Sequence, residues 1–387
     1  MFLSGIIAEF NPLHTGHQLL IDTAKKDGVV ACVISSNFVQ RGDVAIAEKR
    51  IRTEMALNAG ADLVLEMPTA YSCSTAQNFA FAGVSILDAI GCDSLLFGSE
   101  SGNICDLEKA SEILNTPEFS EKLKQNLEGG VTFAAAREKA AKECGLKTDI
   151  LNKPNNNLAV EYINAIKSIN SKMQYKTVSR KGAAHDSKDI EAFVSASLLR
   201  EKLISGDYDF CEKYISAENL KLLKSENIAD IKNIENMLLG ILRTKSIDEL
   251  KKLPDISEGV ENKLFSAIKT ATTLDELYSL IKVKRYTHAR IRRLVISAAL
   301  GLDDSFFIKT PPYIRVLGFN KKGEEILKQI RKKSKIPLIL RAKEIEGLSD
   351  NAKKLFELEI TATDLYMLSL NKPRECGFEY KAKLIKG

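Results

Sequence analysis

The first two hundred residues alternate short apolar runs with segments of helical periodicity, and this alternation constrains the fold more than any other feature of the chain. The runs have the length of buried strands, and each has a helical segment before or after it. Helices that connect successive strands place those strands parallel in one sheet. We therefore predict an α/β fold with a doubly wound parallel sheet, whose strands cover residues 3–8, 29–35, 61–66, 94–97 and 174–179.

The sequence pattern changes at about residue 211, where lysine-rich amphipathic helical segments replace the strand signals. Further strand signals appear only at residues 311–319 and 337–341. A chain of 387 residues also exceeds the usual size of one compact core. We predict a catalytic sheet domain over residues 1–210 and a helix-rich, basic C-terminal domain over residues 211–387.

Basic residues are concentrated in the second of these regions. Residues 282–343 contain 17 Lys and Arg against four acidic residues, a net charge of +13 in a chain whose formal total is +5. Such an asymmetry favours a polyanionic partner, most often nucleic acid.

The composition also indicates where the protein works. No run of about 18 apolar residues is present, and the N-terminal segment reaches Glu9 too early for a signal peptide. The seven cysteines are scattered without the spacing of metal ligands, which favours reduced structural thiols. We expect a cytoplasmic protein with no membrane partner.

The loop after the first strand carries the most informative residues. Ligands of open parallel sheets bind beyond the carboxyl ends of the strands. This loop, EFNPLHTGH over residues 9–17, places His14 and His17 directly before a helical pattern at residues 18–26. Pro12 fixes a turn, and Gly16 permits close approach of a ligand to the backbone.

Two imidazoles three residues apart at a helix N-terminus predict a phosphate site. Free backbone N–H groups and the positive end of the helix dipole favour phosphate there, and the rings could stabilise the charge of a departing pyrophosphate. A capping histidine beside a surface histidine is the alternative. A metal site formed by this pair with His185 and Asp186 is a weaker one.

A second motif lies at residues 194–200, which read VSASLLR. Ser197 and Arg200 are one helical turn apart and would share a face. Simple N-caps are the alternative for Ser195 and Ser197. Asn37, Gln40 and Arg41 follow the second strand at the same edge, without an assigned role.

These motifs resemble those of a known superfamily. The HTGH tetrapeptide is similar to the HxGH signature of the nucleotidyltransferases, and residues 194–200 resemble their second motif, ISSTxxR, with Ser197 in place of Thr. The longer phrases GIIAEFNPLHTGH, SSNFVQRGD, ADLVLEMP, LLFGSE, KPNNNLAVEY and KRYTHARIRR resemble the bacterial tRNA-Met cytidine acetate ligase family up to about residue 320.

The resemblance implies a Rossmann-like HxGH nucleotidyltransferase fold and an ATP-dependent reaction. Acetate would be activated as acetyl-adenylate, and the acetyl group would pass to the wobble cytidine of elongator tRNA-Met. The catalytic residues would be His14 and His17. Mg²⁺ is expected to accompany ATP, while the sequence indicates neither a protein metal site, nor the acid-binding residues, nor the oligomeric state.

The resemblance also implies an ATP-binding set. Gly98 would lie in the exit loop of the fourth strand and Asn155 in the PNNN turn, and plain turn chemistry is the alternative for both. The full expected set is Ile7, Ala8, Glu9, Phe10, Asn11, Pro12, Leu13, His14, Thr15, Gly16, His17, Gln18, Leu19, Leu20, Gly98, Asn155, Arg180, Ser197 and Arg200.

The basic segment predicts a tRNA-binding helix. Tyr286, Arg290 and Arg293 would share one face, with Ile291 and Leu294 on the buried side. This face would offer cations and one aromatic ring to RNA, and a solvated structural face is the alternative. The expected set is Lys284, Arg285, Tyr286, His288, Arg290, Arg292 and Arg293, and a second basic cluster at residues 331–335 would add phosphate contacts.

Two other functions stay open at this point. A small-molecule adenylyltransferase of coenzyme biosynthesis shares both motifs but leaves the basic segment unexplained. A nonenzymatic RNA-binding protein that retains a nucleotide-binding fold would explain the charge but not the two motifs together.

Overall fold

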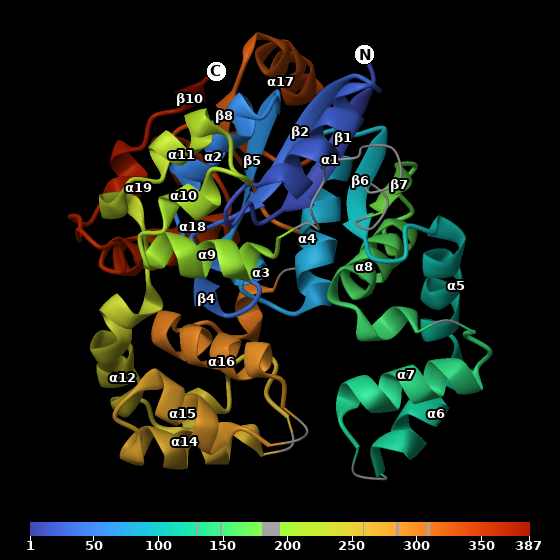
Figure 1. The fold of residues 1–387 in the computed structure, drawn as a ribbon, viewed down its shortest axis with the longest axis vertical. Helices are drawn as coiled ribbons and strands as arrows, with labels where there is room; N and C mark the ends of the chain where they lie inside the picture. The colour runs from blue at the N-terminus through green and yellow to red at the C-terminus, as the bar shows by residue number, and fades with distance from the viewer. Residues whose placement is uncertain (129–130, 148, 180–193, 258, 284–285, 308–309) are drawn as a thin grey trace.

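The computed structural model describes residues 1–387 except 129–130, 148, 180–193, 258, 284–285 and 308–309. One sheet of eight strands runs through the molecule (Figure 1). Its strands are β1 (Leu3–Ala8), β2 (Val29–Ser35), β5 (Leu63–Met67), β6 (Ser94–Ser99), β7 (Gln174–Ser179), β8 (Ile314–Phe319), β9 (Leu338–Ile339) and β10 (Ile385–Lys386). A separate two-stranded hairpin consists of β3 (Phe38–Val39) and β4 (Asp43–Val44).

Helices cover both faces of the sheet and form the lower part of the molecule in Figure 1. Those of the N-terminal half are α1 (Thr15–Lys25), α2 (Lys49–Asn58), α3 (Thr69–Ser72), α4 (Ala76–Ala89), α5 (Ile104–Leu114), α6 (Pro117–Glu128), α7 (Phe133–Glu143), α8 (Pro154–Ser168) and α9 (Ala196–Ile204). The others are α10 (Tyr208–Cys211), α11 (Ala217–Leu222), α12 (Glu235–Arg243), α13 (Ile247–Leu250), α14 (Val260–Thr270), α15 (Leu274–Ile281), α16 (His288–Leu300), α17 (Lys321–Lys333), α18 (Asp350–Met367) and α19 (Phe378–Lys381).

The strand order positions the candidate site. The sheet runs β10-β8-β5-β2-β1-β6-β7, and β5, β2, β1, β6 and β7 are parallel to their neighbours within this group. From β1 the chain first adds β2 and β5 on one side of β1 and then crosses over to add β6 and β7 on the other side. The direction in which strands are added therefore reverses between β1 and β6. In such folds the crevice at the reversal is the usual ligand site.

The predicted α/β fold with a mostly parallel sheet is confirmed. β1, β2 and β7 begin and end at the predicted residues, whereas β6 continues two residues further, to Ser99. Alternate residues of β1 enter two different apolar cores, with Ile6 in one and Ile7 in the other, because both faces of the sheet are covered.

The C-terminal part of the chain adds strands to the same sheet. β8 pairs antiparallel with β5, with Leu63 opposite Phe319, and β10 pairs with β8. The sheet thus crosses the boundary that we expected between residues 210 and 211. The helical character predicted for the second region is present mainly in α10 to α16, which lie between residues 208 and 300.

Two further expectations concern cysteines and membranes. All seven cysteines are free thiols, as the scattered spacing indicates. Among the residues that the structure describes, no helix has the length and apolar character needed to cross a membrane.

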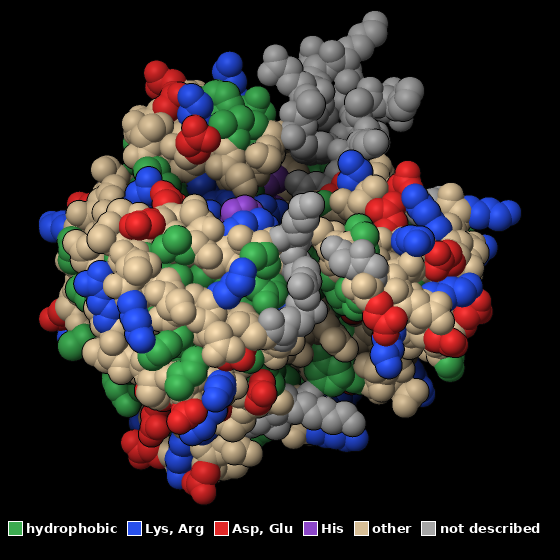
Figure 2. Space-filling model, turned by 90° about the horizontal axis from the view of Figure 1, so that it is seen from below, with side chains coloured by type: hydrophobic (Ala, Val, Ile, Leu, Met, Phe, Trp, Pro, Cys, Tyr) green, Lys and Arg blue, Asp and Glu red, His purple; other side chains and the backbone are tan. Residues whose placement is uncertain are grey.

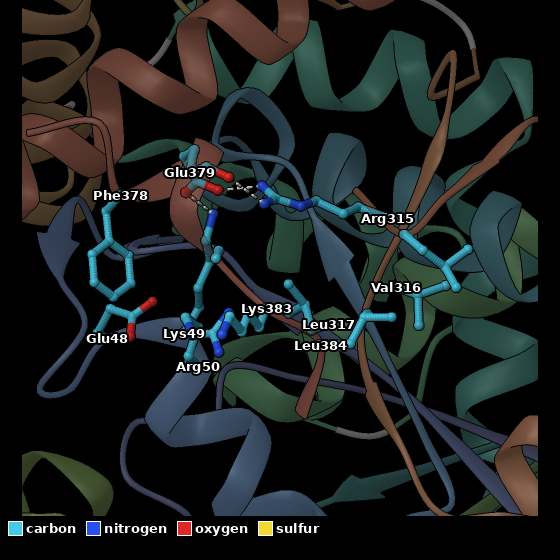
Figure 3. Close-up of a pocket in the computed structure, with 12 residues that line it drawn as sticks. Glu48, Lys49, Arg50, Arg315, Val316, Leu317, Phe378, Glu379, Lys383 and Leu384 are labelled. Carbon is cyan, nitrogen blue, oxygen red and sulfur yellow. Dashed lines mark hydrogen bonds and ion pairs between the residues drawn. The ribbon is translucent and has the colours of Figure 1, made fainter. Parts of the chain in front are cut away.

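A buried ionic cluster fastens the C-terminal elements to the sheet, and Figure 3 shows three of its members, Lys49, Arg315 and Glu379. The Lys49 ammonium, at the start of α2, lies 3.1 Å from the carboxylate of Glu359 on α18 and 2.6 Å from that of Glu379 on α19, and it also contacts Glu66 on β5. Arg315 on β8 contacts Glu66 and Glu379. The Lys49 ammonium therefore occupies the space among the three carboxylates that a metal ion could otherwise fill.

The charges in this cluster depend on one another. Burial would lower the pKa of Lys49, but the three surrounding carboxylates raise it above its ordinary value. Burial would raise the pKa of Glu379, but Lys49 and Arg315 lower it to about 2. All five side chains are nearly inaccessible to solvent, so removal of one cation leaves carboxylates buried without compensation.

We expect Lys49→Met to lower the free energy of unfolding by about 3–5 kcal/mol, because three carboxylates would then face one another around a single arginine. Urea denaturation measures this loss. Lys139→Met, which breaks an exposed ion pair with Glu143 on α7, is the control and should change stability by less than about 1 kcal/mol. A loss below about 1 kcal/mol in the Lys49 variant would show that the cluster does not join the two parts of the chain.

Candidate active site

A cavity of about 400 Å³ opens at the edge of the sheet where β1 and β6 end. Its walls come from the exit loop of β1, the first turns of α1, the loop after β2, β6 itself and the starts of α8 and α9. Most of the residues expected to bind ATP line it, namely Ile7, Ala8, Glu9, Asn11, His14, Gly16, His17, Leu19, Leu20, Gly98, Asn155, Ser197 and Arg200.

Five of the expected ATP-binding residues do not line this cavity. Phe10 and Leu13 are buried in the apolar core below it, and Gln18 turns away to bind Asp22 and the carbonyl of Ala59. Pro12 and Thr15 belong to the same loop and first turn but are also absent from the walls. Arg180, like His185 and Asp186, lies outside the described residues.

His14 and His17 lie side by side, as the spacing predicts. Their ring centroids are 4.2 Å apart, and the Phe10 ring packs edge-on against His17 at 5.2 Å. His14 is also the N-cap of α1, because its Nδ1 accepts the backbone N–H of Gly16 at 3.0 Å. The neutral His14 ring therefore carries its proton on Nε2, which makes that nitrogen a hydrogen-bond donor.

The expectation of free backbone N–H groups at this helix start is wrong. The N–H of Thr15 donates to the carbonyl of Tyr214, and that of Gly16 donates to His14 Nδ1. The N–H groups of His17 and Gln18 both donate to the carbonyl of His14. A phosphate here would be bound by side chains and the helix dipole rather than by the first-turn amides.

A fully buried arginine, which the sequence analysis did not identify, holds the two central exit loops together. Nη1 of Arg52, on α2, donates to the carbonyls of Glu9 at 2.7 Å and Ser35 at 2.9 Å, and its Nη2 donates to the carbonyl of Ser36 at 2.6 Å. Its Nε donates to the carbonyl of Ala47 at 2.8 Å. Arg52 thus fixes the end of β1 relative to the end of β2.

The second motif reaches the same loop from α9. Arg200 donates to the carbonyl of Asn11 at 2.9 Å and to the hydroxyl of Ser197 at 3.2 Å. Burial lowers the pKa of Arg200, while the nearby carboxylates of Glu9 and Asp43 oppose that shift. Ser195 is the N-cap of α9, as the alternative interpretation proposed, whereas Ser197 is not a cap.

Gly98 and Asn155 lie within regular elements rather than in the loop and turn that we expected. Gly98 pairs with Val178 inside the sheet, and Asn155 is in the first turn of α8. The Asn155 side chain donates to Glu100 Oε1 at 2.7 Å, and Glu100 also accepts the N–H of Asn156 at 2.8 Å. Glu100 therefore binds the end of β6 to the N-terminus of α8.

The turn of the β3–β4 hairpin connects the cavity to the basic helix α16. Gln40 and Arg41 line the cavity, and the N–H of Gln40 donates to the Glu9 carboxylate at 3.1 Å. Arg293 on α16 donates to the carbonyl of Gln40 at 3.2 Å. At Gly42 the φ angle is +71°, and an added Cβ would lie 2.4 Å from the backbone nitrogen of Arg293, so only glycine permits this contact.

The arginines of α16 are less available than the amphipathic pattern indicates. Arg290 and Arg293 both pair with Asp255, at 3.5 and 3.1 Å, and their side chains are only 16% and 14% exposed. Tyr286 precedes α16 instead of sharing a face of it, and its side chain is buried in the apolar core, with Arg290 over its ring at 5.2 Å. His288 is exposed, Arg292 is partly exposed, and Lys284 and Arg285 fall outside the described residues.

Among the described residues, basic side chains do not form one continuous patch on the face seen from below. Figure 2 shows Lys and Arg side chains spread over it with Asp and Glu between them. The second basic cluster, on α17, lies elsewhere. Because β8 runs antiparallel to β5, the end of β8 lies beside the start of β5, and the N–H of Asn320 donates to the carbonyl of Asp62 there. α17 follows directly and therefore begins at this edge of the sheet. That edge is opposite the one that bears the cavity.

Sequence reasoning missed much of the inner wall of the cavity. Apolar and aromatic side chains inside helices and strands resemble ordinary core residues, and only the tertiary packing brings them to the site. The lining residues that the sequence analysis did not predict are Phe79, Phe97, Pro154, Leu158, Tyr162, Val178, Ser179, Ser195 and Ala196.

Comparisons with known proteins agree with this geometry. A family model described as HIGH Nucleotidyl Transferase matches residues 1–380. The tRNA(Met) cytidine acetate ligase of Thermoanaerobacter sp. strain X514 is 39% identical over 403 residues, covering 100% of both chains, and that of Clostridium perfringens is 36% identical over 389 residues, covering 95% of each. A crystal structure of Thermotoga maritima TmcAL bound with alpha-thio ATP matches with a TM-score of 0.89 at 29% identity, covering 100% of this chain and 99% of that one.

We expect Arg52→Lys to lower the free energy of unfolding by roughly 2–4 kcal/mol, because an ammonium cannot reach the four carbonyl groups that the guanidinium binds. Urea denaturation gives the value. Arg50→Lys, a half-buried position on the same helix, is the matched control and should be nearly neutral. Equal stability of the two variants would contradict the role assigned to Arg52.

Proposed function

Since this chain belongs to the tRNA(Met) cytidine acetate ligase family of HIGH nucleotidyltransferases, we propose that it activates acetate with ATP and acetylates the wobble cytidine of elongator tRNA-Met. The observation that carries the proposal is the convergence of both motifs on one cavity. His14 and His17 line it from α1, and Arg200 lines it from α9.

The first step is an in-line displacement at the α-phosphorus of ATP. An acetate oxygen forms a bond to that phosphorus while the bond to the bridging oxygen of pyrophosphate breaks, which yields acetyl-adenylate and pyrophosphate. Negative charge builds up on the leaving group, and donors held in place before the reaction stabilise it without reorganisation. We assign this role to Nε2 of His14, to the His17 ring and to Arg200.

The remaining cavity residues provide the ATP site. We assign nucleotide binding to the expected residues that line the cavity, with Gly98 giving close approach to the sheet and Asn155 providing an amide at its rim. Arg41 adds a cation that the sequence analysis left without a role. Arg180 keeps its predicted role but lies outside the described residues.

The cavity also has a group suited to Mg²⁺. Among its described lining residues, Glu9 provides the only carboxylate. Mg²⁺ is commonly held by phosphate oxygens together with one or two carboxylates, and it neutralises phosphate charge. We therefore assign Glu9 as the protein ligand if the metal enters with ATP.

In the second step, the exocyclic amine of cytidine attacks the acetyl carbonyl carbon. The bond from that carbon to the phosphate oxygen breaks, AMP leaves, and the amine loses a proton. The RNA must therefore reach the same cavity. The link from Arg293 through Gln40 to Glu9 supports α16 as the adjoining RNA-binding element, since it places that helix against the rim.

Incubation of the purified protein with ATP, acetate and tRNA-Met tests the proposal directly. We expect AMP, pyrophosphate and N4-acetylcytidine to form, and each should require both acetate and ATP. Transfer of AMP to a small coenzyme precursor without RNA would favour a coenzyme adenylyltransferase instead. RNA binding without any ATP consumption would favour a nonenzymatic protein.

His14→Ala and His17→Ala should each slow acetate-dependent ATP–pyrophosphate exchange about a hundredfold or more, because each removes a donor from the developing charge. Asp22→Ala, an exposed position on α1 outside the cavity, is the control and should retain normal exchange. Near-normal exchange in both histidine variants would contradict the assignment of His14 and His17 to the leaving pyrophosphate.

Arg292→Ala should weaken tRNA binding and reduce the slope of log K against log salt by about one, because one phosphate contact is lost. Acetate-dependent exchange without tRNA should not change. Lys328→Ala, an exposed cation on α17 at the opposite edge of the sheet, serves as the comparison and should leave the slope as it is. Identical slopes for both variants and the unmodified protein would place the RNA elsewhere.

A further inference from the structure

The inner part of the cavity differs in chemistry from its rim. Phe79 from α4, Phe97 from β6, and Leu158 and Tyr162 from α8 line it beside Ile7 of β1. Phe97 and Tyr162 pack with their ring centroids 5.6 Å apart. The polar side chains Asn155, Ser179, Ser195 and Ser197, which also line the cavity, are in contrast half-buried or exposed.

Tyr162 is the unusual member of this inner lobe. Its side chain is only 2% exposed, and among the described residues its buried hydroxyl has no hydrogen-bond partner. A hydroxyl removed from water without a partner is unfavourable, and most buried polar groups in proteins are paired. Because Tyr162 also lines the cavity, a bound substrate can provide the partner that the described part of the protein does not.

The environment of this hydroxyl makes it a donor. Burial raises the pKa of Tyr162 well above its ordinary value, and the Glu9 carboxylate at the end of β1 adds to the shift. The phenol thus stays protonated at any physiological pH. Its natural partner is an oxygen atom that accepts a hydrogen bond, and a carboxylate is the strongest such acceptor.

We propose that Tyr162 is the acid-binding residue and donates its hydroxyl hydrogen to the carboxylate of the small-acid substrate, whose methyl group packs against Phe79 and Phe97. This inference rests on the proposed function, because it assigns the acid site of that reaction. A lobe with apolar walls and one donor matches a short acid, which has one methyl group and one carboxylate. It matches the adenine base poorly, because adenine presents several polar atoms that need partners.

Geometry supports the same assignment. The acid must attack the α-phosphorus from the side opposite the leaving pyrophosphate. The imidazoles and Arg200 occupy the walls formed by α1 and α9, whereas the inner lobe is formed by α4, β6 and α8. A nucleotide bound between the histidines with Arg200 on one side and the inner lobe on the other would present its α-phosphate to an acid held in that lobe.

The same walls would limit the length of the acid. Phe79 and Phe97 are almost completely buried, at 1% and 3% exposure, and both belong to the packed core. Interiors of this kind do not expand easily to admit additional methylene groups. The two rings would therefore exclude acids longer than acetate or propionate.

Tyr162→Phe tests the proposal, because it removes the hydroxyl and keeps the ring. We expect the KM for acetate in ATP–pyrophosphate exchange to rise about tenfold or more, while the KM for ATP changes less than about twofold. Tyr313→Phe is the matched control, since Tyr313 is also buried, its hydroxyl also lacks a partner among the described residues, and it lies outside the cavity. It should leave both constants unchanged.

Two results would overturn the proposal. One is an unchanged KM for acetate in Tyr162→Phe, and the other is a rise in the KM for ATP instead, which would assign the hydroxyl to the nucleotide. A second variant, Phe97→Val, should raise the activity with butyrate relative to acetate at least about fivefold, and an unchanged acid preference would also count against the inner lobe. If the unmodified protein supports no exchange with any acid, the proposed function itself fails, and the acid site fails with it.

Discussion

The site depends on hydrogen bonds that cationic side chains donate to the backbone of the β1 exit loop. Arg52 on α2 donates to the Glu9 carbonyl, and Arg200 on α9 donates to the Asn11 carbonyl. The Asn11 side chain in turn accepts the N–H of Ile46 at 2.7 Å. Because the histidines follow directly in this loop, their position is set by groups far away in sequence. Preorganisation of this kind is what stabilisation of a leaving group requires.

The C-terminal part of the chain contributes to the same framework rather than standing apart from it. β8 extends the sheet beyond β5, and the cluster of Lys49, Arg315 and three glutamates joins α2, β5, α18 and α19. Lys49 begins the helix that also bears Arg52. The helix that orders the exit loops is thus fixed at its start by residues from the end of the chain. Through Gln40, the basic helix α16 is fixed against the same loops.

The sequence alone predicted the parallel strands and the paired histidines, since each is a local pattern. The second motif and the other expected residues that line the cavity came from the resemblance to a known family. The sequence did not predict the pairing of β8 with β5, because strands so far apart in the sequence leave no local sign of their partnership. Burial of Tyr286 was missed because the helical pattern was extended over it, whereas α16 begins only at His288. The first-turn amides appeared free because the sequence shows neither the Tyr214 carbonyl, which accepts the Thr15 N–H, nor the capping role of His14, which accepts the N–H groups of Gly16, His17 and Gln18. Arg52 and Tyr162 resemble an ordinary surface arginine and an ordinary core tyrosine until the fold places them.

The central claim is that the paired imidazoles after β1 receive the pyrophosphate portion of a bound nucleotide. A crystal structure of this protein with a nonhydrolysable ATP analogue tests it most directly. We expect phosphate oxygens within hydrogen-bond distance of His14 Nε2, of the His17 ring and of the Arg200 guanidinium, with the α-phosphate directed toward the inner lobe. Phosphates bound elsewhere on the molecule, or rings turned away from the nucleotide, would contradict the claim.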